Sequence, residues 1–114
     1  MTVDSAGDAV PDLLGLNGTG PVWGMASDDL NATLLVWPAG HELEEHVNSE
    51  RDVLLVVLGG DVVAVVDGHE HALVAGHAFL IEKGRSRSLR AGADGVRYLS
   101  VHIRRSGLQI EAMG

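Results

Sequence analysis

The sequence contains no cysteine, which excludes disulfide bridges and any metal site built from thiolates. Basic residues are also scarce: 8 lysines and arginines stand against 16 aspartates and glutamates, for a formal net charge of -8. A surface of this sign repels phosphate backbones and anionic lipids, so neither a nucleic acid nor a membrane surface is an expected partner. No apolar run approaches the roughly 20 residues of a membrane span.

The first twelve residues contain three aspartates and no basic residue, which argues against a signal peptide. The sequence therefore predicts a cytoplasmic protein. Its length of 114 residues, 46% of them hydrophobic, suits one domain with one core.

The chain divides by composition into two parts. Residues 1–20 are rich in Gly, Asp, Ser and Ala, with Leu13, Leu14 and Leu16 as a small apolar anchor. We interpret them as a loosely ordered N-terminal arm whose leucines pack on the domain that follows. Residues 21–114 form that domain, and they show neither an internal repeat nor a second domain.

From Pro21 onward the apolar residues form short β-type runs separated by turns. The runs are Val22–Ala26, Asn31–Trp37, Val53–Leu58, Val62–Val66, His71–Val74, Phe79–Glu82 and Val96–Ile103. Asp67-Gly68 between two runs is the hairpin signature of a type I′ turn, because both central residues need a positive φ. No segment has a 3.6-residue apolar period, although Glu42–Glu50 is polar enough for a helical turn. The pattern predicts an all-β sandwich or barrel.

The spacing of residues 40–59 resembles the first motif of the cupins. Gly40 is followed after five residues by His46, and Asn48 stands where the motif has its second histidine. After three intervening residues Asp52 replaces the motif's glutamate, and after six further intervening residues comes Gly59.

The second cupin motif is matched in its glycines only. Gly76 and Gly84 keep their register, whereas Glu82 replaces a proline, Arg87 the metal-binding histidine and Ala91 an asparagine. The resemblance covers about residues 23–103, and it implies the cupin fold, a double-stranded β-helix or jelly-roll barrel.

In metal-binding cupins three imidazoles and a carboxylate hold a divalent ion such as iron, manganese, nickel or zinc. The corresponding set here is His46, Asn48, Asp52 and Arg87. A guanidinium has no lone pair to offer, and its charge repels a divalent cation. We therefore expect no metal and no other cofactor; a divalent transition metal, if one binds, is expected near His46.

An arginine that points into a barrel needs a partner, because an unpaired buried charge is costly. Asp52 could supply it as a structural ion pair. Alternatively, Arg87 awaits an anionic ligand such as a carboxylate or phosphate. The residues leave both possibilities open.

The last β-type run alternates two sets of side chains, and we place Tyr98, Ser100 and His102 on the inward face. His46, His102 and Asp52 would then be candidates for general acid–base catalysis, or for a rearranged metal triad. The opposing interpretation is a polar core layer without turnover. Trp37 lies before the first motif and could stack on a flat ligand at the pocket mouth or merely cap the core.

Three functions follow from the resemblance and these residues. The first is a metal-free cupin that binds a small, anionic molecule through Trp37, His46, Asn48, Asp52, Arg87, Tyr98 and His102. The second is a metal-dependent isomerase, dioxygenase or decarboxylase acting on a small polar substrate. The third is a dimeric scaffold without pocket chemistry. Cupins commonly pair through a sheet face, so we expect a homodimer in each case.

Overall fold

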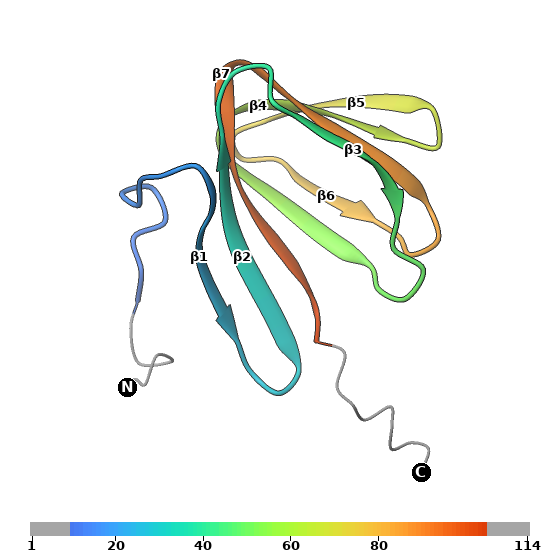
Figure 1. The fold of residues 1–114 in the computed structure, drawn as a ribbon. Helices are drawn as coiled ribbons and strands as arrows, with labels where there is room; N and C mark the ends of the chain where they lie inside the picture. The colour runs from blue at the N-terminus through green and yellow to red at the C-terminus, as the bar shows by residue number, and fades with distance from the viewer. Residues whose placement is uncertain (1–9, 105–114) are drawn as a thin grey trace.

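The computed structural model describes residues 10–104, which form seven β-strands and no helix (Figure 1). The strands are β1 (Gly20–Ala26), β2 (Leu30–Trp37), β3 (Glu42–Val47), β4 (Val53–Val66), β5 (His69–Val74), β6 (Ala78–Ile81) and β7 (Ser86–Ile103). All neighbouring strands are antiparallel. The all-β prediction is confirmed. Nothing in this part of the chain is a helix that could cross a membrane.

Two long strands, β4 and β7, bend and run through both layers of the barrel. The first half of β4 pairs with β6 and with the second half of β7, to which β2 and then β1 are added. The second half of β4 pairs with β5 and with the first half of β7, to which β3 is added. The layers are therefore β1-β2-β7-β4-β6 and β3-β7-β4-β5, sharing their two central strands.

The bend of β4 lies at Gly60, opposite the bend of β7. Gly60 has φ 71°, and a Cβ atom there would lie 2.1 Å from the carbonyl oxygen of Gly95. Only glycine allows this approach. The sequence predicted that Gly59-Gly60 would separate two strands. That prediction was wrong, because the glycines let one strand bend without leaving the sheet.

Two further boundaries differ from the sequence prediction. Residues 42–47 form strand β3, which the sequence did not predict, and a bulge between Leu43 and His46 removes the alternation that marks a strand. Strand β7 begins at Ser86 instead of Val96. The predicted hairpin is confirmed: Asp67 and Gly68 have φ values of 49° and 84°, between paired strands β4 and β5.

The core fills the space between the layers with inward-facing side chains of β4, β5, β6 and β7. It contains Val53, Leu55, Val57, Val62, Ala64, Leu73, Ile81, Ala91, Val96 and Tyr98.

The described part of the N-terminal arm lies against the outer face of β7. Arg97 donates hydrogen bonds to the carbonyl oxygens of Leu13 (2.8 Å) and Leu16 (2.6 Å). Both leucines are half-buried, as predicted, whereas Leu14 is 64% exposed. Residues 1–9 of the predicted arm and 105–114 of the predicted domain lie outside the described residues.

Candidate functional site

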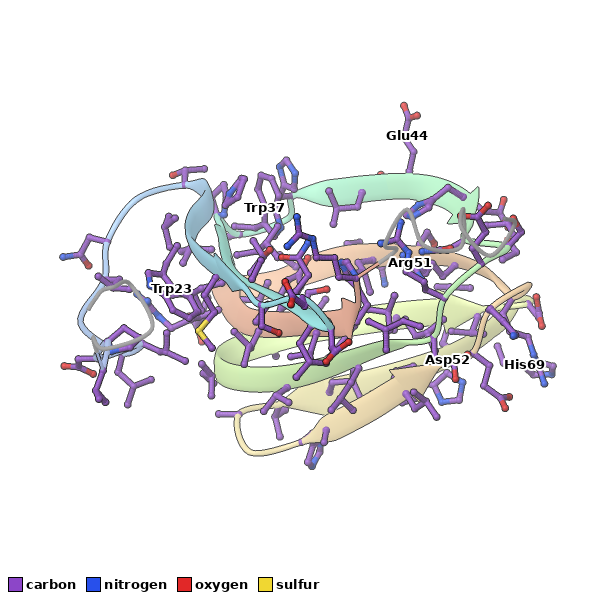
Figure 2. All side chains as sticks on the ribbon, turned by 90° about the horizontal axis from the view of Figure 1, so that it is seen from below. Trp23, Trp37, Glu44, Arg51, Asp52 and His69 are labelled. Atoms are coloured by element: carbon purple, nitrogen blue, oxygen red, sulfur yellow. The ribbon has the colours of Figure 1, made fainter. Side chains whose placement is uncertain are left out.

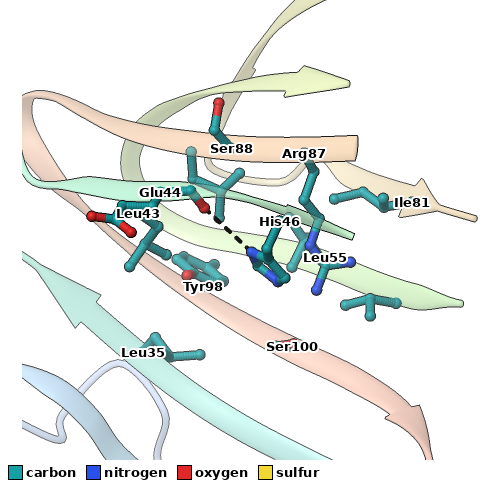
Figure 3. Close-up of a pocket in the computed structure, with 12 residues that line it drawn as sticks. Leu35, Leu43, Glu44, His46, Leu55, Ile81, Arg87, Ser88, Tyr98 and Ser100 are labelled. Atoms are coloured by element: carbon teal, nitrogen blue, oxygen red, sulfur yellow. Dashed lines mark hydrogen bonds between the residues drawn. The ribbon is translucent and has the colours of Figure 1, made fainter. Parts of the chain in front are cut away.

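A cavity of about 140 Å³ lies between the two layers (Figure 3). Most of its wall is apolar, formed by Leu35, Leu43, Val53, Leu55, Ile81 and Leu89. Six residues with polar side chains also line it, namely Glu44, His46, Arg87, Ser88, Tyr98 and Ser100. An apolar cavity with a few polar groups is the usual form of a small-molecule site.

His46 and Arg87 reach the cavity from neighbouring strands. They are directly paired across β3 and β7. Cross-strand partners share one face of a sheet, and Figure 3 shows both side chains directed into the cavity. The ring Nδ1 of His46 lies 3.3 Å from the carbonyl oxygen of Glu44, whose own side chain points away from the barrel (Figure 2).

Arg87 is half-buried, and within residues 10–104 it has no hydrogen-bonding or ion-pair partner. Burial lowers the pKa of its guanidinium, because a charged group loses hydration inside the barrel. The neighbouring Tyr98 acts in the opposite direction. Arginine nevertheless stays protonated at physiological pH, so an uncompensated positive charge faces the cavity.

Tyr98 presents its hydroxyl group at the same cavity. Burial raises the pKa of this phenol, and hydrogen bonding from Trp37 and the charge of Arg87 oppose the rise. Trp37 Nε1 donates to the Tyr98 oxygen over 3.2 Å. Indole is a donor only, so the tyrosine keeps its own proton free to donate. Tyr98 and Ser100 face inward, as the sequence predicted.

Two residues of the predicted site do not line the cavity. Asp52 is exposed, and its Oδ1 accepts a hydrogen bond from the backbone N–H of Lys83 over 2.9 Å. Strand alternation places it on the outer side with Leu54, so it does not pair with Arg87. Asn48 follows β3, and its Oδ1 accepts hydrogen bonds from the N–H groups of Glu50 (3.0 Å) and Arg51 (3.1 Å). It orders a turn instead of facing a ligand.

Trp37 and His102 are also absent from the cavity wall. Trp37 packs against the core, and His41 stacks on its ring with centroids 4.0 Å apart and planes inclined by 1°. This favours the capping interpretation. His102 lies on the inward row two residues beyond Ser100, and its Nδ1 is 3.4 Å from Nη1 of Arg51. The predicted acid–base group of His46, Asp52 and His102 is therefore not assembled.

Arg51 was missed by the sequence analysis. It lies directly after the Asn48 turn, near the C-terminal end of β3 in Figure 2, and its Nε atom is buried without a hydrogen-bonding partner. Its position two residues before the inward Val53 was the available indication, because alternate residues of a strand share a face.

The donor set at the four motif positions does not fit a divalent transition metal. His46 is one imidazole, Oδ1 of Asn48 and Oδ1 of Asp52 accept backbone N–H groups, and Arg87 carries no lone pair. Nor do three or more His, Asp or Glu side chains gather elsewhere in residues 10–104 in a group that could hold a metal ion.

The fold is shared with solved structures of low sequence identity. The TT1209 protein of Thermus thermophilus superposes with a TM-score of 0.72 at 25% identity, covering 84% of this chain and 97% of that one. The Cnp3 cupin domain of Schizosaccharomyces pombe gives 0.69 at 18%, covering 81% and 69%. A cupin-2 domain protein of Shewanella frigidimarina gives 0.63 at 19%, covering 70% and 76%.

This chain has the cupin fold. No protein-family model matches the sequence, and no curated protein matches it significantly. Gly59, the last glycine of the first motif, directly precedes Gly60, at which β4 bends. The cupin fold does not by itself assign an activity, because one fold hosts many functions.

Proposed function

We propose that this cupin barrel binds a small anionic molecule in the cavity beside Arg87 and acts without a metal ion. The observation that carries the proposal is the Arg87 guanidinium, half-buried and facing the cavity without a carboxylate partner in residues 10–104. In a chain with twice as many acidic as basic residues, an internal ion pair would have been easy to supply.

The neighbouring groups support the same ligand chemistry. Arg87 and the free proton of Tyr98 donate hydrogen bonds, and Ser100 adds a hydroxyl group. Carboxylates would repel an anion, but Asp52 lies outside the cavity, and the side chain of Glu44, a residue of the cavity wall, points away from the barrel (Figure 2). A ligand with acceptor oxygens and a negative charge complements this wall, and a carboxylate can accept two parallel hydrogen bonds from a guanidinium.

A direct binding experiment tests the proposal. Titration calorimetry with acetate, pyruvate, butyrate and inorganic phosphate should show saturable binding of at least one of these anions to the purified protein. Arg87→Met should reduce its affinity roughly tenfold or more, the effect of removing a charge-assisted hydrogen bond.

The matched control is Arg90→Met, three residues along β7. Arg90 is exposed and does not line the cavity, so its replacement removes the same charge without altering the site. Equal losses for the two variants would mean that binding is a general charge effect. Absence of binding for every anion would refute the proposal and favour the scaffold hypothesis.

The enzyme hypothesis makes a different prediction. A metal-dependent cupin should contain stoichiometric transition metal after expression in metal-supplemented medium. The donor set described above leads us to expect no bound metal by elemental analysis. One metal ion per chain would overturn the metal-free part of the proposal.

A further inference from the structure

The inward rows of the barrel end on a second positively charged group. Val53 on β4 and Ser100 on β7 line the cavity. Two residues farther along each of these segments, on the same inward side, lie Arg51 and His102. These two side chains meet, with Arg51 Nη1 lying 3.4 Å from His102 Nδ1. The contact therefore stands at the end of the barrel immediately beyond the cavity wall.

The Arg51 guanidinium has fewer hydrogen-bond acceptors than donors. Its Nε is buried without a partner, and among residues 10–104 no carboxylate lies within ion-pair distance of it. His102 Nδ1 is also 3.0 Å from the carbonyl oxygen of Ile103. One ring nitrogen cannot both donate to a carbonyl and accept from a guanidinium. The contact with His102 thus leaves Arg51 short of acceptors, and a buried donor without an acceptor is costly.

The turn after β3 fixes the position of this arginine. Asn48 Oδ1 accepts the backbone N–H of Arg51 over 3.1 Å, and the carbonyl oxygen of Asn48 accepts from the N–H of Gly84 over 2.8 Å. The residue at the second ligand position of the cupin motif therefore acts as a positioning residue, which holds Arg51 at the end of the barrel.

From this arrangement we infer that Arg51 and His102 form a second acceptor-binding point, so that the ligand is a short dicarboxylate or a similar small dianion. One acidic group binds at Arg87 and the other at Arg51. The inference rests on the proposed function and specifies its ligand class. A volume of about 140 Å³ fits it, since a cavity near 150 Å³ holds benzene.

The test compares matched pairs of ligands by titration calorimetry: succinate with butyrate, and glutarate with pentanoate. Of succinate and glutarate, the one that binds more tightly to the native protein should bind at least tenfold more tightly than the monocarboxylate paired with it. Arg51→Met should abolish this difference while leaving monoacid affinity unchanged, whereas Arg87→Met should weaken both. Asn48→Ala should reduce the difference, because it releases the turn that holds Arg51.

Stability measurements separate a ligand-binding arginine from a structural one. Replacing Arg51 with methionine removes an unsatisfied charge, so the melting temperature without ligand should stay the same or rise. A lower melting temperature together with unchanged dicarboxylate selectivity would overturn the inference. Butyrate binding that depends on Arg87 but shows no dicarboxylate preference would overturn it while leaving the proposed function intact. Failure of every anion to bind would remove both.

Discussion

Tyr98 is the only tyrosine of the chain, so its ionisation can be followed directly. Burial raises its pKa above the ordinary 10.0. The phenol therefore stays protonated in the folded protein at a pH at which the unfolded chain already ionises it. Its contribution to the free energy of unfolding is full below pH 10 and is lost as the pH rises through the raised pKa.

We expect the phenolate absorbance of the folded protein to appear above pH 10 and to coincide with loss of folded structure. The same titration in urea should give the ordinary value. Tyr98→Phe should flatten the alkaline decline of stability. A folded-state midpoint at or below 10 would contradict the burial of this group.

Asp67 contributes to the loss of stability at acid pH. Hydrogen bonds from the backbone N–H of Ser86 and then from Arg85 lower its pKa below the ordinary 3.8. The resulting stabilisation is present above the ordinary pKa of 3.8 and is lost as the pH falls through the lowered pKa of the folded protein. Asp67→Asn, which still tolerates a positive φ, should show a shallower acid decline in urea unfolding series. Arg85→Gln should have a smaller effect, since it removes only the lesser cause.

The candidate site was predictable only in part. His46 and Arg87 followed from motif spacing, and Tyr98 followed from the alternation of the last strand. The prediction that Asn48 and Asp52 line the site was wrong, because motif spacing alone does not show where β3 ends or which face of the sheet Asp52 occupies. Arg51 lies outside the motif and is placed by a turn that depends on the side chain of Asn48.

At the scale of single strands, the bend of β4 offers a sharp test. Gly60→Ala places a Cβ against the Gly95 carbonyl in a left-handed backbone conformation, and we expect a loss of about 2 kcal/mol or more in the free energy of unfolding. Gly59→Ala is the matched control, because its Cβ would only contact Arg97 at 3.7 Å. Chemical denaturation of both variants should separate them clearly. Equal effects would contradict the described bend.

Local sequence patterns predicted most strands, because β2, β4, β5 and β6 bury one face and are each followed by a turn that contains a glycine. The pattern failed at β3, which buries little and contains a bulge. It also failed to join the halves of β4 and β7. A bent strand and a turn between two strands use the same glycines, and only the long-range pairing distinguishes them.

At the scale of the whole molecule, one layer exposes what we call the outer apolar face. Direct cross-strand pairing puts Met25, Ala32, Val101, Leu54 and Leu80 in one row and Leu30 beside Ile103 in another. Leu30, Leu54, Leu80, Met25 and Ile103 are all exposed in the chain considered alone. An apolar face of this extent usually marks an interface, and a two-fold axis can match it to itself.

We therefore expect a homodimer in sedimentation experiments at micromolar concentration. Leu54→Glu should shift it to monomer, because it places a charge in the centre of the face. Val74→Glu is the control, since Val74 is similarly exposed but lies on β5 in the other layer. A native protein that sediments as a monomer would refute the expected pairing.

The sharing of β4 and β7 between the layers has a consequence for cooperativity. The two layers cannot separate from each other while β4 and β7 stay intact. The barrel of residues 10–104 therefore offers no hinge about which the cavity could open. Slow hydrogen exchange should give one common opening free energy for central amides of both layers. A bound anion should raise that value in both layers by the same amount, as mass action requires for a protein that unfolds as one unit.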